Sequence, residues 1–480
     1  MSTPGKISDL PVGPPPAAPG QADDWPHTRR AVPWLIAAFM GMIFLIPFDS
    51  AKLPFQAGLF DLRLDRIAVF VIGTVWLAAV ATGKVGAPRL RHSPVNLALG
   101  VFAALAVASV LLNLQSLANA DELGLALKKL ILLGSYIVFF FIVASSVRPG
   151  EVRAFLKLAL GLSIVTALGV VYEYRTGTNI FWNTTDALLP GNALPASKSA
   201  IFDATGRRGI TGPTAHGLAV TTLLSMTLPL AVMAVMRARE RRARLLNIAM
   251  VAILLGGSVA TVRKSAAIVP VVGFVVLALY RPRAMVRLAP MFAVLLVVVH
   301  LMAPGAMGSI KSQLFPKTGF YNSPSVQGRT ADFAAVKPDL EHHALFGRGY
   351  GTYDPAKYRL LDNQYLGLRI NDGWLGYFAY LGVLLSVALA GHRIARTRDP
   401  SRSAAAIATV AAAGALAVAS KLFDALAFPQ VPYAFLFFAG LVVALGGVPV
   451  ARARAAPEPE PPTAQREPVP AGYVFAARKG

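Results

Sequence analysis

The chain has 480 residues, of which 55% are hydrophobic and only 15% are charged, against roughly 25% charged residues in an ordinary soluble domain. It has no cysteine, which excludes disulfides and thiolate metal sites. Its formal net charge of +22 comes from cations beside apolar segments, where an anionic membrane surface accounts for them, so nucleic-acid binding is not expected.

Apolar residues fall in runs of about 16–24, the length that a helix needs to cross roughly 30 Å of hydrocarbon. These runs of Leu, Val and Ala lack the alternation of a membrane β-strand. The predicted fold class is therefore all-α, a polytopic membrane helical bundle. About twelve spans are expected, at residues 33–48, 66–82, 95–112, 125–145, 153–173, 214–236, 245–261, 265–280, 288–303, 373–391, 403–420 and 429–447.

Both ends of the chain are rich in proline and small residues, and such segments bury too little apolar area to offset chain entropy. Residues 1–30 and the Pro-rich residues 449–480 are predicted to be disordered tails. Between them we expect spans one to nine over residues 31–303, a large loop over 304–372, and spans ten to twelve over 373–448.

Lysine and arginine gather in the connections that twelve spans would place on one side of the membrane. The positive-inside rule makes that side cytoplasmic, together with both termini. These cations are Arg29, Arg30, Lys84, Arg89, Arg91, Arg148, Arg237, Arg239, Arg241, Arg242, Arg244, Arg281, Arg283, Arg287, Arg393, Arg396, Arg398, Arg402, Arg452 and Arg454.

Two outward connections, 174–213 and the large loop 304–372, are long enough to carry function. The large loop interleaves aromatic residues with charge, a composition that suits stacking on sugar rings and gripping phosphate. Its aromatic residues and those just beyond it are Phe315, Phe320, Tyr321, Phe333, Phe346, Tyr350, Tyr353, Tyr358 and Tyr365.

Arginines also occur on the outward side, where the topology rule disfavours them. Arg207 and Arg208 precede the sixth span, Arg263 lies in the tight turn between spans seven and eight, and Arg329 and Arg348 lie in the large loop. Cations at disfavoured positions point to a ligand. Anchoring to lipid headgroups is the alternative interpretation.

The stretch from Gly328 to Gly376 resembles the C-terminal signature of the O-antigen ligase and O-antigen polymerase superfamily. Two further segments are similar to the family: Arg207-Arg208-Gly209 at the start of the sixth span, and the turn 261–265, where the family usually has Ser-Arg. The resemblance covers roughly residues 200–390. The matches in the signature are Arg329, Phe333, the turn 347–351, Asp362-Asn363, Gly373 and Gly376.

This resemblance implies an enzyme of the bacterial inner membrane whose active face is periplasmic. Its donor would be an oligosaccharide on undecaprenyl diphosphate, its second substrate an acceptor glycan, and it would need no cofactor or metal. Membrane lipids and a chain-length regulator are further expected partners. Ligases that attach O-antigen to lipid A-core typically have His where this chain has Asp362, whereas polymerase-like members often have Asp-Asn, which favours a polymerase and leaves a ligase as the alternative.

The residue roles follow from the family chemistry. Arg263 is expected to stabilise the charge that develops on the leaving diphosphate, with Arg207, Arg208, Arg329 and Arg348 binding the substrate beside it. The alternative for Arg263 is a structural helix cap.

Asp362 is expected to act as the base that receives the proton of the acceptor hydroxyl, and Asn363 to hold a sugar hydroxyl or Asp362 itself. A loop carboxylate or a helix N-cap is the alternative for Asp362. His216 and Tyr350 are candidates for contact with substrate, although a packed histidine is the plainer interpretation of His216. Asp372 is read as an N-cap.

Two other classes of protein compete with this interpretation. A flippase for lipid-linked oligosaccharide would place charged residues in the middle of several spans, whereas the spans here are nearly free of charge. A non-catalytic scaffold of an envelope assembly complex would tolerate loss of the outward arginines.

Overall fold

The computed structural model describes residues 24–48, 63–82, 87–188, 209–314, 324–397 and 399–449. Within these ranges the protein is all-helical, apart from a two-stranded antiparallel pairing of β1 (Arg91–His92) with β2 (Val448–Pro449). The predicted tails fall almost entirely outside the described residues. The α-helices are α1 (Ala31–Leu45), α2 (Leu64–Thr82), α3 (Pro94–Leu112), α4 (Leu114–Asn119), α5 (Leu123–Ser146), α6 (Val152–Thr176), α7 (Ile180–Leu188), α8 (Gly217–Arg237), α9 (Arg241–Ala260), α10 (Ser265–Tyr280), α11 (Pro282–Met302), α12 (Ala306–Leu314), α13 (Pro324–His342), α14 (Gln364–Ala395), α15 (Pro400–Leu422) and α16 (Gln430–Gly446).

Every one of the predicted apolar segments coincides with one of these helices. In the part of the chain that is described, eight helices are long and apolar enough to cross a membrane: α2, α3, α5, α6, α8, α9, α14 and α15. The helix α11 adds a ninth candidate that bends by 52°, and α1, α10 and α16 are apolar but shorter. The protein is thus a multi-pass helical membrane protein, and the full count of twelve crossings stays a prediction.

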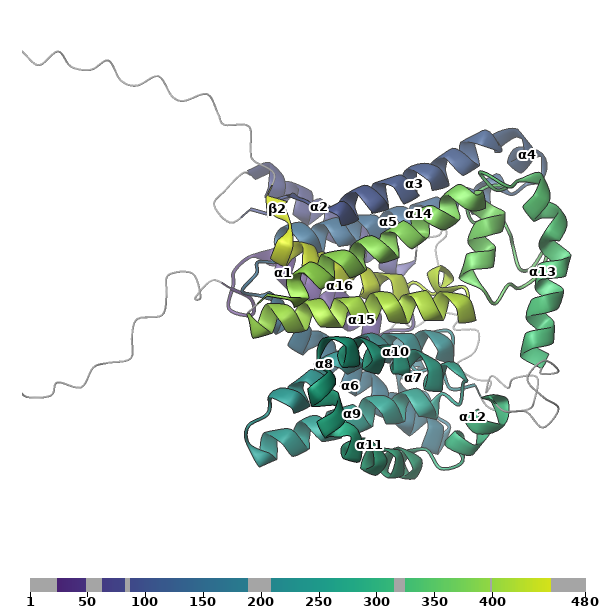
Figure 1. Ribbon diagram of the computed structural model, residues 1–480. Helices are drawn as coiled ribbons and strands as arrows, with labels where there is room; N and C mark the ends of the chain where they lie inside the picture. Colours follow the sequence, from purple (N-terminus) through teal and green to yellow (C-terminus); the bar gives the residue numbers. More distant parts are fainter. Residues whose placement is uncertain are drawn as a thin grey trace, which may run out of the picture.

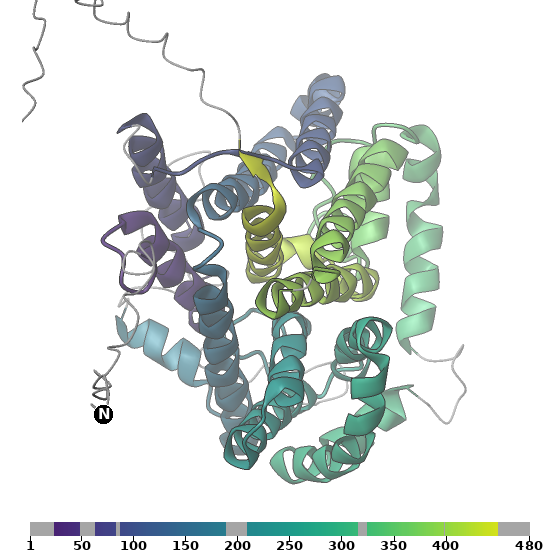
Figure 2. The same ribbon diagram turned by 60° about the vertical axis from the view of Figure 1, so that its left-hand side comes forward.

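The helix α16 forms the centre of the bundle, surrounded by α1, α5, α8, α14 and α15 (Figure 2). Its Tyr433 is fully buried among aromatic rings, with the centroid of Tyr136 at 4.7 Å and that of Phe39 at 5.0 Å. Both α8 and α16 are buried nearly all around, as expected for apolar helices in the middle of a large bundle.

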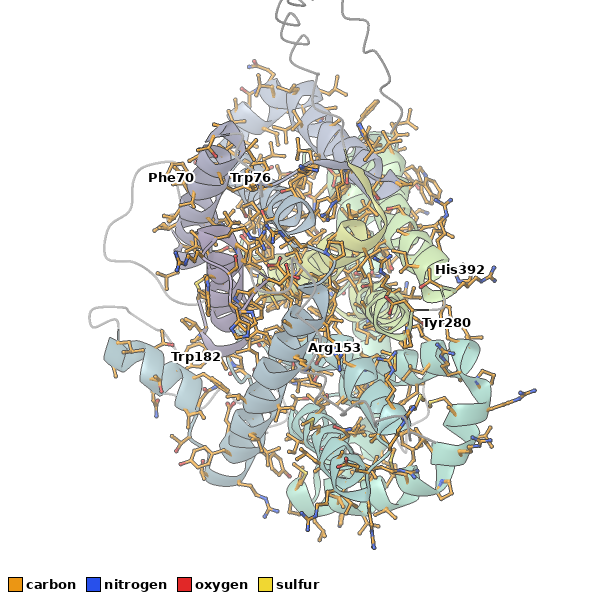
Figure 3. The ribbon with its side chains drawn as sticks, turned by 90° about the vertical axis from the view of Figure 1, so that its left-hand side faces the viewer. Phe70, Trp76, Arg153, Trp182, Tyr280 and His392 are labelled. Carbon is orange, nitrogen blue, oxygen red and sulfur yellow. The ribbon has the colours of Figure 1, made fainter. Side chains whose placement is uncertain are left out.

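Outer helices present apolar side chains away from the bundle, as a lipid-facing surface requires. Phe70 projects outward from α2 with 75% of its surface exposed (Figure 3). On the same helix Trp76 is tied to α5, because its indole nitrogen donates a 2.8 Å hydrogen bond to the hydroxyl of Ser145. The helix α2 therefore has one face toward α5 and one face toward the surroundings.

The expected large loop 304–372 contains two helices of its own, α12 and α13, followed by the first turns of α14. Figure 1 shows α13 lying crosswise over one end of α14 and α15. We call this end of the bundle the cavity end, after the cavity described in the next subsection. The expected loop 174–213 contains α7, and its residues 189–208 lie outside the described part.

A sharp kink divides α14. Gly373, with φ 65° and ψ −159°, is non-helical inside it, so Gln364–Asp372 and the remainder of α14 are two segments at an angle. The predicted start of the tenth span at residue 373 falls on this kink, and the helix itself begins nine residues earlier. Residues 344–349 form backbone hydrogen bonds of 2.9–3.2 Å with residues 370–375, which satisfies the amides and carbonyls that the kink releases.

Candidate functional site

A cavity of about 330 Å³ opens at the cavity end of the bundle. Its wall is built from residues that are far apart in the sequence: the start of α5, the start of α8, the segment 350–362, the first turns of α14, and the connection 423–428. Three of the predicted site residues, His216, Tyr350 and Asp362, line it. A concave site of this volume is at the small end of the range of roughly 300–1,000 Å³ that ligand pockets occupy.

Asp362 stands at the cavity wall, immediately before α14. The neighbouring Asn363 is the N-cap of that helix, because its Oδ1 accepts hydrogen bonds from the amides of Tyr365 at 3.1 Å and Leu366 at 3.4 Å. The capping role that was the alternative for Asp362 therefore belongs to Asn363, whose amide oxygen is engaged in it. The Asp362 side chain is left exposed at the cavity.

Gln364, which follows Asn363, connects two parts of the cavity wall. The amide of Gln364 donates to the carbonyl of Phe423 at 3.2 Å, and its side-chain Oε1 accepts from the amide of Leu426 at 2.8 Å. These bonds connect the start of α14 to the connection between α15 and α16. Asp362 and Asp424 thus lie in the same cavity.

Arg263 lies in a strained turn between α9 and α10. The preceding Val262 has φ 54°, a left-handed conformation that costs a β-branched residue of order 1–3 kcal/mol. The turn is anchored by Thr261, whose hydroxyl donates to the carbonyl of Ser258 at 2.7 Å. The Arg263 side chain passes the start of α8, where a Cβ atom on Gly217 would be 3.6 Å from the Arg263 Cγ.

Charges from three separate segments act on Asp362. Partial desolvation at the cavity wall raises the pKa of its carboxyl, and Asp332 adds to that effect, whereas the guanidinium groups of Arg329 and Arg263 oppose it. Two of the predicted arginines are therefore close enough to influence the predicted base. Arg329 is held beside the end of α15 by a 3.3 Å hydrogen bond from its Nη2 to the carbonyl of Leu422.

A third cation belongs to this group. Burial and the nearby Arg329 lower the pKa of Lys264, which follows Arg263 in the turn. Like charges that are brought together repel one another, and a bound anion would relieve that repulsion. The group formed by Arg263, Lys264 and Arg329 near Asp362 is therefore suited to an anionic group such as a diphosphate.

His216 caps α8 from the cavity wall. Its Nδ1 accepts a hydrogen bond from the amide of Leu218 at 3.2 Å. Burial, reinforced by the charge of Arg263, lowers the pKa of His216 to about 4, so the ring is neutral at pH 7. Because Nδ1 acts as an acceptor, the ring proton resides on Nε2, which makes His216 a neutral hydrogen-bond donor beside the cavity.

Lys129 and Asp424 also line the cavity, and the sequence interpretation missed them both. Burial and the charge of Asp362 raise the pKa of Asp424, whereas Lys129 opposes this. Lys129 could have been selected from the sequence, because it is a cation in the first turns of α5, at the end predicted to face outward.

Arg348 belongs to a different cluster. Its Nη2 lies 2.8 Å from Oε2 of Glu122, which is only 4% exposed, and its guanidinium carbon lies 4.3 Å from the ring centroid of Tyr358. Lys357 pairs with the other Glu122 oxygen at 2.9 Å. Burial raises the pKa of Glu122, but the hydrogen bonds from Tyr358 and Lys357 and the charge of Arg348 outweigh it and lower the pKa overall. Arg348 thus joins the segment 348–358 to the start of α5, and its binding to substrate stays a prediction.

Arg207 and Arg208 lie outside the described residues, so their binding to substrate stays a prediction. Asp372 was predicted to be an N-cap, and this was wrong, because α14 is capped by Asn363 and Asp372 lies inside the helix just before the kink.

The site therefore has a neutral donor and several carboxyl groups around one small cavity, with a group of cations near Asp362. No protein-family model matches the chain. No curated protein matches it either.

Proposed function

We propose that this protein is a membrane glycosyltransferase that polymerises repeat units of a bacterial surface polysaccharide. It would transfer a glycan from an undecaprenyl-diphosphate donor to an acceptor sugar hydroxyl. The reaction would take place on the periplasmic face of the inner membrane, with both termini in the cytoplasm. This proposal adopts the family that residues 200–390 resemble.

One observation carries the proposal. Asp362, Arg263 and Arg329 come from three segments that are widely separated in the chain, and both guanidinium groups are close enough to act on the carboxyl group. Each was selected from the sequence for the same reaction. A carboxylate beside two guanidinium groups at the end of membrane helices is the set of groups that transfer from a lipid diphosphate requires.

The chemistry can be assigned to these side chains. The acceptor hydroxyl oxygen attacks the anomeric carbon of the donor, and the bond between that carbon and the phosphate oxygen breaks. The electron pair of that bond leaves on the diphosphate, where Arg263 and Arg329 stabilise the new negative charge. The hydroxyl proton passes to Asp362, whose raised pKa makes it a better proton acceptor than an ordinary aspartate.

Only the type of residue at position 362 favours a polymerase over a ligase in this chain. A ligase that attaches polymer to lipid A-core is the second candidate, and it typically has His at this position. The donor and the fate of the diphosphate are the same in both cases. They differ in the acceptor, which is a sugar of the growing chain for a polymerase and a core sugar for a ligase.

The test is a glycan profile of the cell envelope in a strain that lacks the gene. The strain is complemented with wild type, Arg263→Ala, Asp362→Asn or the control Arg242→Ala, at equal membrane levels. Arg242 is exposed in the first turn of α9, at the end of that helix opposite to Arg263.

We expect single-repeat glycans to accumulate with the two site variants and long chains to return with wild type and the control. Long chains that stay unattached to lipid A-core would support the ligase. Normal envelope glycans in every strain would reject the glycosyltransferase and favour a flippase or a scaffold.

A further inference from the structure

Asp372 forms part of the wall of the cavity, where it has an unusual environment for a charged residue. Only 1% of its surface is exposed, and neither carboxyl oxygen has a hydrogen-bond partner among the described residues. Burying a carboxyl group without a hydrogen bond costs free energy, so native proteins nearly always supply a partner. The oxygens of Asp372 therefore lack donors that something entering the cavity could provide.

The backbone around Asp372 is held in place from two sides. The hydroxyl of Ser109 donates to the carbonyl of Asn371 at 2.7 Å, and the Oδ1 of Asn371 accepts from the amide of Tyr353 at 3.1 Å. Gly373 follows directly and forms the kink of α14. The backbone next to Asp372 is thus fixed at a position from which Asp372 lines the cavity.

The surfaces around this carboxyl group combine aromatic faces with acceptors. Tyr350, Tyr353 and Phe428 line the cavity with Asp372 and Asp424. Burial raises the pKa of Tyr350, and the charges of Asp372 and Asp424 add to this, which places both carboxyl groups near the phenol. A carboxyl group offers acceptor oxygens to a ligand, so a fitting ligand is one that has several donors and an apolar face.

A sugar ring has these properties, because its hydroxyls donate and the C–H groups of its faces pack against aromatic rings. A cavity of about 330 Å³ suits a sugar ring rather than a long oligosaccharide. We propose that Asp372 binds the acceptor sugar by accepting a hydrogen bond from a hydroxyl other than the one that reacts at Asp362. This inference rests on the proposed function in one respect, which is that the bound sugar is the acceptor. The sugar site itself can be tested without catalysis.

The first measurement is thermal unfolding of the full-length protein in nanodiscs, without ligand. Asp372→Leu should unfold at a higher temperature than wild type, because it removes a buried carboxyl group that has no partner. The comparison is Asp332→Leu, which removes a buried carboxylate that has a partner, because Asp332 forms a 2.5 Å ion pair with Arg359. This variant should unfold at a lower temperature than wild type. A lower unfolding temperature for Asp372→Leu and for the isosteric Asp372→Asn would assign Asp372 a structural role and overturn the proposal.

The second measurement adds methyl glycosides of glucose, galactose, mannose and N-acetylglucosamine, with a fully O-methylated glucoside as the probe that has no hydroxyl donors. At least one glycoside should raise the unfolding temperature of wild type and of Asp362→Asn. The rise should be absent in Asp372→Leu and partial in Asp372→Asn, which keeps one acceptor oxygen. No response in wild type, an equal response in Asp372→Leu, or an equal response to the O-methylated probe would each overturn the proposal.

These outcomes are separate from those of the envelope glycan profile. A sugar response that depends on Asp372, combined with normal glycans in the deletion strain, would retain the sugar site and reject the glycosyltransferase. Single-repeat glycans in the deletion strain without any sugar response would retain the glycosyltransferase and reject this subsite.

Discussion

A Cβ atom placed on Gly373 would stand 2.3 Å from the backbone carbonyl of Leu345, closer than any real contact permits. Gly373→Ala should therefore force the two segments apart, in addition to the strain of a residue other than glycine at φ 65°. We expect the free energy of unfolding to fall by about 1–3 kcal/mol from the backbone strain, and by more when the clash is added. Thermal unfolding in nanodiscs measures this.

The matched control for that substitution is Gly367→Ala in the first segment of α14. A Cβ atom there meets nothing within 4 Å, and the backbone is helical. The control should be neutral or gain up to about 1 kcal/mol, because alanine is the better helix former. Equal unfolding temperatures for the two variants would contradict the backbone contact between the kink and residues 344–349.

The ion cluster of Glu122 predicts a second effect on stability. Glu122→Gln removes one partner of Arg348 and Lys357 and should cost on the order of 3 kcal/mol, at the low end for a buried pair. Because the folded pKa of Glu122 is lowered, its contribution is present above the ordinary value of 4.5 and is lost as the pH falls through the folded pKa. Unfolding curves of wild type should show this acid loss. If the curves of Glu122→Gln show the same acid loss, another group causes it.

His216 should also make stability depend on pH, over a different range. Its pKa is about 4 in the folded protein and 6.5 ordinarily, so the unfolded chain binds a proton first as the pH falls. Stability should be full above about 6.5 and decline down to about 4. The variant His216→Asn keeps a good helix N-cap but has no titrating ring. Its unfolding temperature should vary less with pH over this interval, and an unchanged profile would place the titration elsewhere.

The charges around Asp362 predict how the acid limb of the reaction rate should move. Under the proposed function, the base must be ionised, so the rate falls as the pH drops through its raised pKa. Arg329→Ala removes a cation that favours the ionised form and should move the limb to higher pH. Asp332→Asn removes a charge that disfavours it and should move the limb to lower pH. Rates of repeat-unit transfer across a pH series measure both, and shifts of the same sign would contradict this arrangement.

The arginine of the strained turn should be sensitive to shape as well as charge. Arg263→Ala should lower the rate of transfer by about 10²–10³, the typical cost of losing one group that stabilises a developing charge. Arg263→Lys should recover only part of that loss, because an ammonium group cannot bind phosphate oxygens in the paired geometry of guanidinium. Full activity of Arg263→Lys would show that only net charge at the turn matters.

The helices could be predicted from the sequence, but the partners of individual charged side chains could not. Apolar runs directly require helices in lipid, so each predicted segment coincides with a helix. Arg263 and Arg348 look equivalent as outward arginines, yet the partner of Arg348 is Glu122, which lies 226 residues away. No local pattern carries such a pairing.

The start of α14 and the role of Asp372 were misjudged for a related reason. An aspartate at the start of an apolar run is a favoured helix N-cap, and here it lies inside a helix, just before the kink at Gly373. The kink is stable only because residues 344–349 satisfy its free backbone groups, and that contact is tertiary. The signal that the sequence did contain was Asn363, which is a good N-cap residue ahead of an amphipathic stretch.

The distribution of charge around the cavity has a consequence for direction. Arg263, Lys264 and Arg329 gather near Asp362, whereas Asp372 and Asp424 lie along the cavity wall with Tyr350. A molecule that is anionic at one end and hydroxylated at the other is attracted in one orientation and repelled in the reverse one. A chain that grows at such a site would always be extended from the same end, and the polarity of the polymer would be set before any bond is made.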